Sequence, residues 1–316
     1  MAGEPDLPSI LVLYDGHTVE TRNFPRRFRG LAWDQNGSSL TLVGNRGRLL
    51  KIQDGDRGVS PDAGITHNLR SVSINPIDNT ALVVGNAGTI ITIKANGSLT
   101  KMSSPTFENL RAVRWNANGT MALIAGNNGT LIKYTERGLE TVNGGGANLR
   151  GISWRKNTDQ ALITSNCFAE EFIPSPNLFL FDARTNALKP LSEGRSDLIG
   201  VDWNPDGNLA VVVGYDVVWH NGFIGRFDAS GLSPFEFQDS QVYPIAVSWD
   251  TTGRVAAIAT SIAQLRSGEG RVILWNGEAF QEIYRNESFF FSNIAWSPVG
   301  FKLAAIASTE ARTFDS

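Results

Sequence analysis

The chain has 316 residues, of which 28 are Lys or Arg and 31 are Asp or Glu, and its formal net charge is -3. This balance gives no bulk electrostatic reason to expect a nucleic-acid-binding protein, so a charged partner would need a local patch. The single cysteine, Cys167, excludes an internal disulfide framework.

The first predicted strands lie near the N-terminus, in ILVLYDGHTVETRNFP (10–25). After them the chain repeats one pattern, in which two apolar residues two positions apart indicate a strand and the second of them serves as an anchor. The anchors are Trp33, Ile74, Trp115, Trp154, Trp203, Trp249 and Trp296. Their spacing of 39 to 49 residues is typical of a four-stranded propeller blade.

Turn signals divide each repeat into further strands. Stretches such as NANG (116–119) and NPDG (204–207) follow the anchors, and a second apolar run comes after them. In the first three repeats this run ends in GNRG, GNAG and GNNG, which we interpret as hairpin turns. A phosphate-binding loop is the alternative, but these glycines do not stand between a strand and a helix.

Each end of the chain supplies only two strands of a blade, and the two pairs of strands are complementary. The N-terminal segment aligns with a third and a fourth strand, whereas NIAWSPVGFKLAAIAS (293–308) supplies only a first and a second. Together they should form one blade that closes the ring and protects its strand edges. We therefore predict an all-β fold in which residues 1–316 form a single seven-bladed β-propeller with four antiparallel strands per blade. The predicted blades cover residues 26–66, 67–107, 108–146, 147–195, 196–242 and 243–288, with 9–24 plus 289–316 as the seventh.

The repeats resemble WD-repeat propeller blades. The resemblance rests on IAWSPVGFKLAAIAS and VDWNPDGNLAVVVG and on the strand ends LYD, LFD, RFD and LWN, and it covers essentially the whole chain. The repeats of blades 2 and 3, which contain GNAGTI and GNNGTL, are also similar to photosystem-assembly-factor-type propellers. No Gly-His dipeptide precedes the inner strands, and the terminal Trp-Asp is degenerate, so the resemblance implies a divergent WD-like propeller without a transferable function.

In WD-type propellers two sets of connections emerge on one face, called the top: those from the second to the third strand and those from the outer strand to the next blade. The first set is long here in blades 4 to 6, where it contains apolar and aromatic residues, and SFFF (288–291) enters blade 7 on the same face. Such clusters mark contact sites, or else fold over one another as a buried cap. The candidate contact residues are Phe168, Phe172, Tyr215, Trp219, His220, Leu265, Arg266 and Phe290.

Three inner strands begin with the same motif, in NLRSVSI (68–74), NLRAVRW (109–115) and NLRGISW (148–154). Four residues before the anchors, blades 1 to 4 carry Arg29, Arg70, Arg111 and Arg150, which we call the arginine crescent; blades 5 to 7 carry Ile199, Ile245 and Ser292. These arginines should surround the top mouth of the central channel, where guanidinium groups would suit carboxylates or phosphates. The alternative is a packing role, because each arginine should share the strand face of the buried Val or Trp and bridge to a neighbouring blade. The repeated asparagines, Asn68, Asn109 and Asn148, are interpreted as residues that bond to turn or backbone groups.

The favoured function is a non-enzymatic interaction platform, a scaffold or assembly factor, that binds a protein partner with acidic groups through the top face. The alternative is a propeller hydrolase or lyase that acts on an anionic small molecule such as an acidic sugar or phosphoester, with Glu170, Asp216 or Glu269 as acid-base candidates. Sialidase-like propellers use arginines in this way, but their S-x-D-x-G-x-T-W boxes are absent from this sequence.

No catalytic residue, metal or cofactor is predicted. The three histidines, His17, His67 and His220, lack metal-ligand spacing, and no base is assigned to Cys167. The N-terminal stretch does not have the pattern of a signal peptide, and no stretch approaches the roughly 18 apolar residues of a membrane helix. We therefore expect a cytoplasmic protein without membrane insertion or specific nucleic-acid binding. Membership of a larger assembly stays open.

Overall fold

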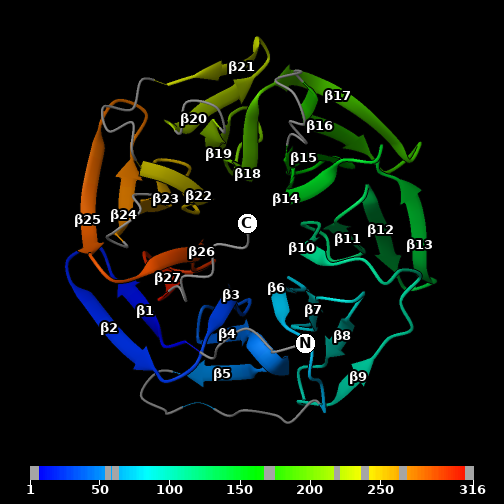
Figure 1. Cartoon of the computed structure of the whole chain (residues 1–316), viewed down its shortest axis with the longest axis horizontal. Coiled ribbons are helices and arrows are strands. Elements are labelled where there is room, and N and C mark those ends of the chain that lie inside the picture. Colours follow the sequence, from blue (N-terminus) through cyan, green and yellow to red (C-terminus); the bar gives the residue numbers. More distant parts are fainter. Residues whose placement is uncertain are drawn as a thin grey trace, which may run out of the picture.

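Seven small β-sheets surround a central axis in the computed structural model, like the blades of a propeller (Figure 1). The structure describes residues 7–53, 58, 64–166, 175–216, 221–235, 242–262 and 269–309. Six sheets have four antiparallel strands and the sheet of blade 1 has three within the described residues. Four strands were predicted for blade 1 (26–66), and in the part of this range that follows the third strand, residues 54–57 and 59–63 lie outside the described residues. The predicted all-β, seven-bladed fold is confirmed.

The strands follow one another outward from the axis in blades 1 to 6. Blade 1 contains β3 (Phe28–Trp33), β4 (Ser39–Gly44), the short 3-10 turn η1 (Asn45–Gly47) and β5 (Leu49–Gln53). Blade 2 contains β6 (Leu69–Ile74), β7 (Ala81–Gly85), β8 (Ile90–Ile93) and β9 (Leu99–Lys101). Blade 3 contains β10 (Leu110–Trp115), β11 (Met121–Gly126), β12 (Thr130–Thr135) and β13 (Gly138–Asn143). Blade 4 contains β14 (Asn148–Trp154), β15 (Gln160–Asn166), β16 (Ser175–Asp182) and β17 (Ala187–Gly194). Blade 5 contains β18 (Ser196–Trp203), β19 (Ala210–Asp216), β20 (Asn221–Asp228) and β21 (Gly231–Pro234). Blade 6 contains β22 (Val242–Trp249), β23 (Ala256–Ile262), β24 (Gly270–Trp275) and β25 (Phe280–Asn286).

Both chain ends build blade 7, as predicted from the two strands that each end supplies. Its strand order is β2 (Val19–Phe24), β1 (Ser9–Tyr14), β27 (Leu303–Ser308) and β26 (Phe290–Trp296). Strand β1 pairs with β27 along its whole length, from Ser9 opposite Ser308 to Tyr14 opposite Leu303. The ring is therefore closed by backbone hydrogen bonds between the two ends of the chain, which removes two exposed strand edges.

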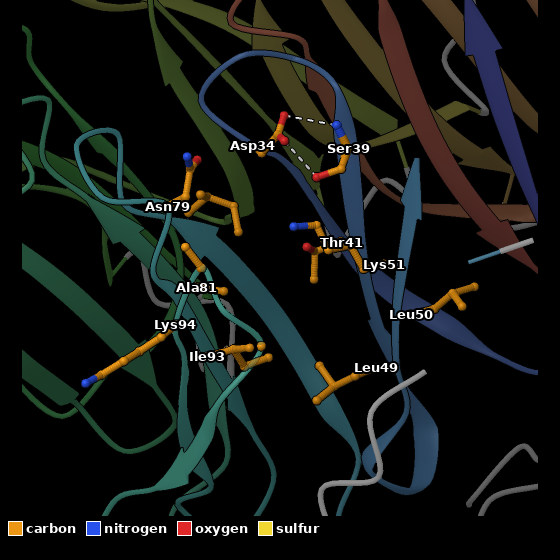
Figure 2. Close-up of a pocket in the computed structure, with 13 residues that line it drawn as sticks. Asp34, Ser39, Thr41, Leu49, Leu50, Lys51, Asn79, Ala81, Ile93 and Lys94 are labelled. Atoms are coloured by element: carbon orange, nitrogen blue, oxygen red, sulfur yellow. Dashed lines mark hydrogen bonds between the residues drawn. The ribbon is translucent and has the colours of Figure 1, made fainter. Parts of the chain in front are cut away.

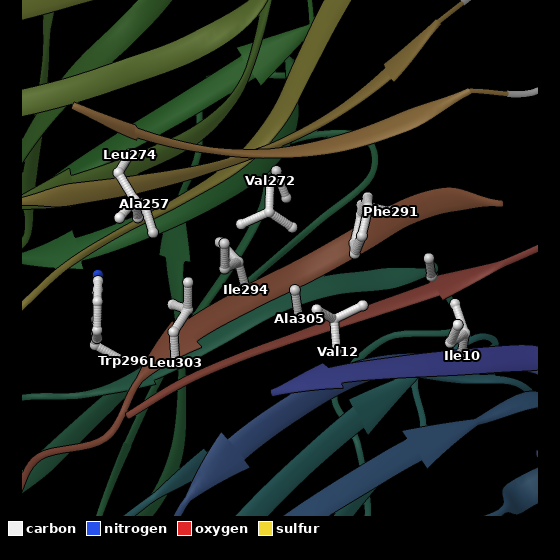
Figure 3. Packing of buried hydrophobic residues seen from close by; sticks show 12 residues of the cluster. Ile10, Val12, Ala257, Val272, Leu274, Phe291, Ile294, Trp296, Leu303 and Ala305 are labelled. Atoms are coloured by element: carbon white, nitrogen blue, oxygen red, sulfur yellow. The ribbon is translucent and has the colours of Figure 1, made fainter. Parts of the chain in front are cut away.

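The hydrophobic core lies between neighbouring blades. Between blades 6 and 7, Val272 and Leu274 face Ile294 and Ala305 across the gap (Figure 3). The other clusters are built in the same way from facing sheet surfaces, for example Leu82 of blade 2 against Leu110 of blade 3. Full burial of one such side chain contributes about 1.5–3 kcal/mol, so the blades hold each other in the ring.

Polar residues join the inner strands of successive blades next to the axis. The residue before an anchor accepts a hydrogen bond from the backbone N–H of the next anchor, as Ser73 does from Trp115 at 3.1 Å and Ser153 does from Trp203 at 3.0 Å. Asp202 has this place in blade 5 and accepts from the Trp249 N–H at 2.8 Å. These bonds satisfy donors that the inner strand cannot pair within its own sheet.

Candidate functional site

Every inner strand carries a register shift near its start, at the position four residues before the anchor. In β6, for example, Leu69 pairs with Gly85 and Ser71 pairs with Val84, so that Arg70 is the extra residue. The extra residue or pair contains Arg29, Arg70, Arg111, Arg150, Ile199, Ile245 or Ser292 in the seven blades. A bulge of this kind interrupts the alternation of a strand and changes the direction of a side chain. The strict alternation on which the expected shared strand face of these arginines rests is therefore interrupted at the arginine itself.

Six of the seven bulge residues line a cavity at the axis, and Arg29 of blade 1 is not among its lining residues. A central cavity of about 200 Å³ is lined by Arg70, Arg111 and Arg150 on one side. Ile199, Ile245 and Ser292 line it on the other side. Arg114, which precedes the anchor Trp115, also lines this cavity. The cavity therefore has a cationic half and a neutral half.

Each arginine of the crescent is held by an asparagine of its own blade. The Nε atoms of Arg29, Arg70, Arg111 and Arg150 donate to the Oδ1 atoms of Asn45, Asn86, Asn127 and Asn166 at 2.5–3.0 Å. The asparagine ends or directly follows the second strand, 16 residues beyond the arginine. This bond uses one of the five N–H donors of a guanidinium, so it fixes the direction of the group and leaves its charge unchanged.

The first asparagine of the Asn-Leu-Arg motif binds the hairpin of the preceding blade. Asn68 Oδ1 accepts from the Arg46 backbone N–H at 3.0 Å, and Asn109 and Asn148 repeat this contact in the next blades. The hairpins themselves have left-handed conformations at both central residues, for example at Arg46 and Gly47, which is the type I′ geometry. The hairpin interpretation and the backbone-bonding interpretation of these asparagines are both confirmed.

Tyr215 joins the crescent from blade 5. It occupies the position that Asn166 has in blade 4. Burial raises the pKa of Tyr215 to about 12, and the charge of Asp197 and a hydrogen bond to its carboxylate add to this effect. Burial lowers the pKa of Arg150, and its attraction to Tyr215 and Asp197 opposes this effect. The Tyr215 ring packs on Tyr243 of blade 6 with 5.1 Å between the centroids. The structure therefore brings two predicted site residues, Arg150 and Tyr215, together.

The remaining predicted contact residues have different outcomes. Phe290 begins β26 and is half-buried, whereas its neighbour Phe291 is only 2% exposed and packs against Tyr284. The expectation that SFFF lies at the surface is thus wrong for Phe291, because the bulge at Ser292 places that ring in the core between blades 6 and 7. Six predicted residues lie outside the described residues: Phe168, Phe172, Trp219, His220, Leu265 and Arg266.

One residue of this face was missed by sequence reasoning. Phe107 lies in the connection from β9 to β10 and its side chain is 93% exposed. The adjacent Glu108 accepts a hydrogen bond from Gly88 N–H at 2.8 Å through its backbone carbonyl, which places this connection against the hairpin of blade 2. The sequence signal for this residue was its position in PTFENLR (105–111), which connects the outer strand of blade 2 to the inner strand of blade 3. Connections of this kind were expected to emerge on the top face.

The acid-base candidates for an enzyme are not assembled as a catalytic pair. Glu269 accepts from Arg271 Nε at 2.5 Å and lies 3.4 Å from Arg285 Nη1, so two cations already bind this carboxylate. Asp216 ends β19, and Glu170 lies outside the described residues. In the described part of the chain, no group of three His, Cys, Asp or Glu side chains could hold a metal ion. Within the same residues, no helix is long and apolar enough to cross a membrane.

The seven sheets around one axis define a seven-bladed β-propeller. The chain is similar to the β-propeller domain of Myceliophteria thermophila Cps50 (Swd1), with a TM-score of 0.67, 13% identity and coverage of 94% of this chain and 100% of that domain. It is also similar to Kuenenia stuttgartiensis hydrazine synthase, with a TM-score of 0.70, 10% identity and coverage of 90% and 96%. At these sequence identities, the similarity establishes a shared fold only. No family model and no curated protein matches the sequence.

Proposed function

We propose that this protein is a non-enzymatic interaction platform that binds an acidic segment of a partner protein through the top face of the propeller. The observation that carries the proposal is the arginine crescent, in which four guanidinium groups of successive blades are each held by an asparagine. A preorganised guanidinium binds carboxylates with less loss of side-chain freedom than a mobile one.

The distribution of charge supports a partner that crosses the face in one direction. Arg70, Arg111 and Arg150 line one half of the central cavity, and Ile199 and Ile245 line the opposite half. An acidic segment would place its carboxylates over blades 2 to 4 and its apolar residues over blades 5 and 6. Since the whole protein has a net charge of -3, local charge rather than net charge would select this partner.

Phe107 supplies an exposed aromatic side chain in the connection between blades 2 and 3, the blades that carry Arg70 and Arg111. Exposed aromatic side chains are typical anchors of protein interfaces. The likeness to the Cps50 (Swd1) propeller domain is compatible with a scaffold role. The similarity to photosystem-assembly-factor-type repeats and the cytoplasmic location stay predictions.

The test is capture of partners from native lysate by the wild-type protein and by a variant with Arg70, Arg111 and Arg150 replaced by Gln. Glutamine removes the charge and keeps an N–H donor for the asparagine. The matched control replaces three exposed cations away from this face, Arg137, Arg184 and Lys189, by Gln, which changes the net charge equally. A protein retained by wild type and control and lost from the crescent variant, with unchanged melting of all three, supports the proposal. Equal capture by the folded crescent variant would exclude the crescent from binding.

A further inference from the structure

A second cavity, of about 210 Å³, lies between blades 1 and 2, away from the arginine crescent (Figure 2). Thr41 and Leu49 line it from blade 1, and Ile74, Ala81 and Ile93 line it from blade 2. These last three residues are register partners across β6, β7 and β8, so they form one continuous row on the sheet surface. The cavity therefore has an ordered wall that belongs to regular strands.

The same row is filled with aromatic side chains in most other blades. In blade 3 it reads Trp115, Ala122 and Tyr134, and the two rings pack edge to face with 5.5 Å between the centroids. Blades 4 to 6 repeat a tryptophan, an alanine and an aromatic residue, namely Trp154, Ala161 and Phe181; Trp203, Ala210 and Phe227; and Trp249, Ala256 and Trp275. Blade 2 has isoleucine at both aromatic positions, and its anchor is the one that is not tryptophan.

The missing indole explains the position of the cavity. Trp154 of blade 4 donates its indole N–H to the Arg114 carbonyl of blade 3 at 3.0 Å, and Trp33 of blade 1 donates to Ala295 of blade 7 at 3.1 Å. The anchor ring therefore reaches toward the preceding blade. Ile74 would have to reach blade 1 in the same way, but its side chain has no ring, and both Ile74 and Ile93 are half-buried against the core. The cavity is the space that a tryptophan occupies elsewhere in the ring.

Size and charge define what could fill this space. A dry cavity of about 150 Å³ holds a benzene molecule, so 210 Å³ accommodates one bicyclic aromatic system. Lys51 and Lys94 line the cavity from the two blades, and both residues are exposed. The Lys51 ammonium points toward the cavity, whereas the Lys94 side chain extends away from the other lining residues (Figure 2). The Asp34 carboxylate accepts hydrogen bonds from Ser38 and Ser39, which direct its oxygens to its own turn. Lys51 is therefore the charged group with which an anionic ligand in the cavity can pair.

We propose that the cavity between blades 1 and 2 is a binding site for a planar aromatic carboxylate of about the size of indole. The ring would take the place of the absent tryptophan between Leu49 and Ile74, and the carboxylate would face the Lys51 ammonium. This site is separate from the top face and does not depend on the platform function.

The experiment titrates the full chain with indole-3-carboxylate and with neutral indole by calorimetry. Four variants accompany the wild type. Ile74→Trp and Ile93→Tyr fill the cavity with the residues that blade 3 places there, Ile74→Val keeps it open, and Lys51→Met removes the cation. Thermal melting shows whether each variant is folded, and Ile93→Tyr provides a second filled cavity if Ile74→Trp does not fold.

We expect saturable binding of indole-3-carboxylate to the wild type and to Ile74→Val, and at least roughly tenfold weaker binding to either filled variant. The Lys51→Met variant should lose roughly fivefold in affinity for indole-3-carboxylate and keep its affinity for indole, because only the carboxylate uses this lysine. No saturable binding to the wild type, or unchanged binding to a folded filled variant, would overturn the site. Equal loss of both probes in the lysine variant would overturn the carboxylate assignment.

Discussion

Arg70 donates a hydrogen bond from Nε to Asn86 Oδ1 at 2.8 Å, and three other blades repeat this pair of residues at the same separation. The repeats provide their own comparison. Where the inner strand has Arg at the bulge, the second strand is followed by Asn; blades 5 to 7 have neither, and Tyr215, Ser261 and Ser308 stand at the asparagine position. The arginine and the asparagine are thus one structural unit that also presents a charge to the channel.

Replacement of Asn86 by Ala tests the contribution of this pair to stability. The variant removes the acceptor of the Arg70 Nε bond, and we expect the free energy of unfolding to fall by about 1–2 kcal/mol, since a hydrogen bond to a charged group contributes more than a neutral one. Ser261→Ala is the control, because Ser261 has the equivalent position in blade 6, where the bulge residue is Ile245. Chemical denaturation of both variants gives the comparison. Equal losses would show that the arginine bond contributes nothing specific.

Closure of the ring by β1 can be tested with one matched pair of substitutions. Val12 of β1 is 2% exposed, and its register partner in β2, Thr21, is exposed. Val12→Asp would bury an unpaired carboxylate and should lower the free energy of unfolding by several kcal/mol, whereas Thr21→Asp should change it by less than about 0.5 kcal/mol.

Deletion of residues 9–24 should have a larger effect than Val12→Asp, with a lower melting temperature of the whole ring. Three core side chains, Ile10, Leu11 and Val12, leave the protein with this segment, and their burial contributes about 5 kcal/mol or more. This is a large share of the roughly 5–15 kcal/mol that stabilises a typical protein. Differential scanning calorimetry gives the answer, and a truncated protein that melts like the full chain would contradict closure by β1.

Asp202 joins three blades and its replacement should depend strongly on the new side chain. Its carboxylate accepts from Ser153 Oγ at 2.9 Å and from Trp249 N–H at 2.8 Å, and burial raises its pKa. Asp202→Ala leaves both donors without this acceptor and should cost about 1–3 kcal/mol. Asp202→Ser should cost less, because a serine accepts the same backbone bond in two other blades. These serines are Ser73 in blade 2 and Ser248 in blade 6. Denaturation of both variants measures the difference, and an equal loss would refute the role of the backbone bond.

Tyr215 should give the protein a stability loss at high pH. Its pKa is raised from 10.0 to about 12 in the folded protein, so the folded state holds the phenolic proton more tightly than the unfolded state. The contribution of the Tyr215 phenol to the free energy of unfolding is complete below pH 10 and is lost as the pH rises from about 10 to about 12. Phenolate absorbance of the wild type minus that of Tyr215→Phe follows the titration.

Asp197→Asn should lower the pKa of Tyr215, because the carboxylate both repels the phenolate and accepts its proton in a hydrogen bond. Asp216→Asn is the control, since Asp216 follows Tyr215 on the same strand and is not among the groups that raise its pKa. An unchanged titration in Asp197→Asn would show that burial alone raises this pKa.

The sequence by itself determined the blade count, the strand pattern and the closure by both chain ends. Each follows from local features that recur in every repeat, namely apolar pairs with period two and turns that need left-handed residues, and from the half-blades at the two termini. It also predicted that Arg29, Arg70, Arg111 and Arg150 surround the top mouth of the channel, and the last three of them line the central cavity.

Tertiary structure alone decided how those arginines arrive there. The bulge at Arg70 breaks the period-two rule, and no pattern within one strand reveals an extra residue that appears only on pairing with β7. The burial of Phe291 follows from the same kind of bulge, and the exposure of Phe107 depends on the hairpin that its connection crosses. The cavity beside Ile74 likewise exists only between two blades. These features depend on contacts between distant parts of the chain, whereas the repeat pattern is local to each blade.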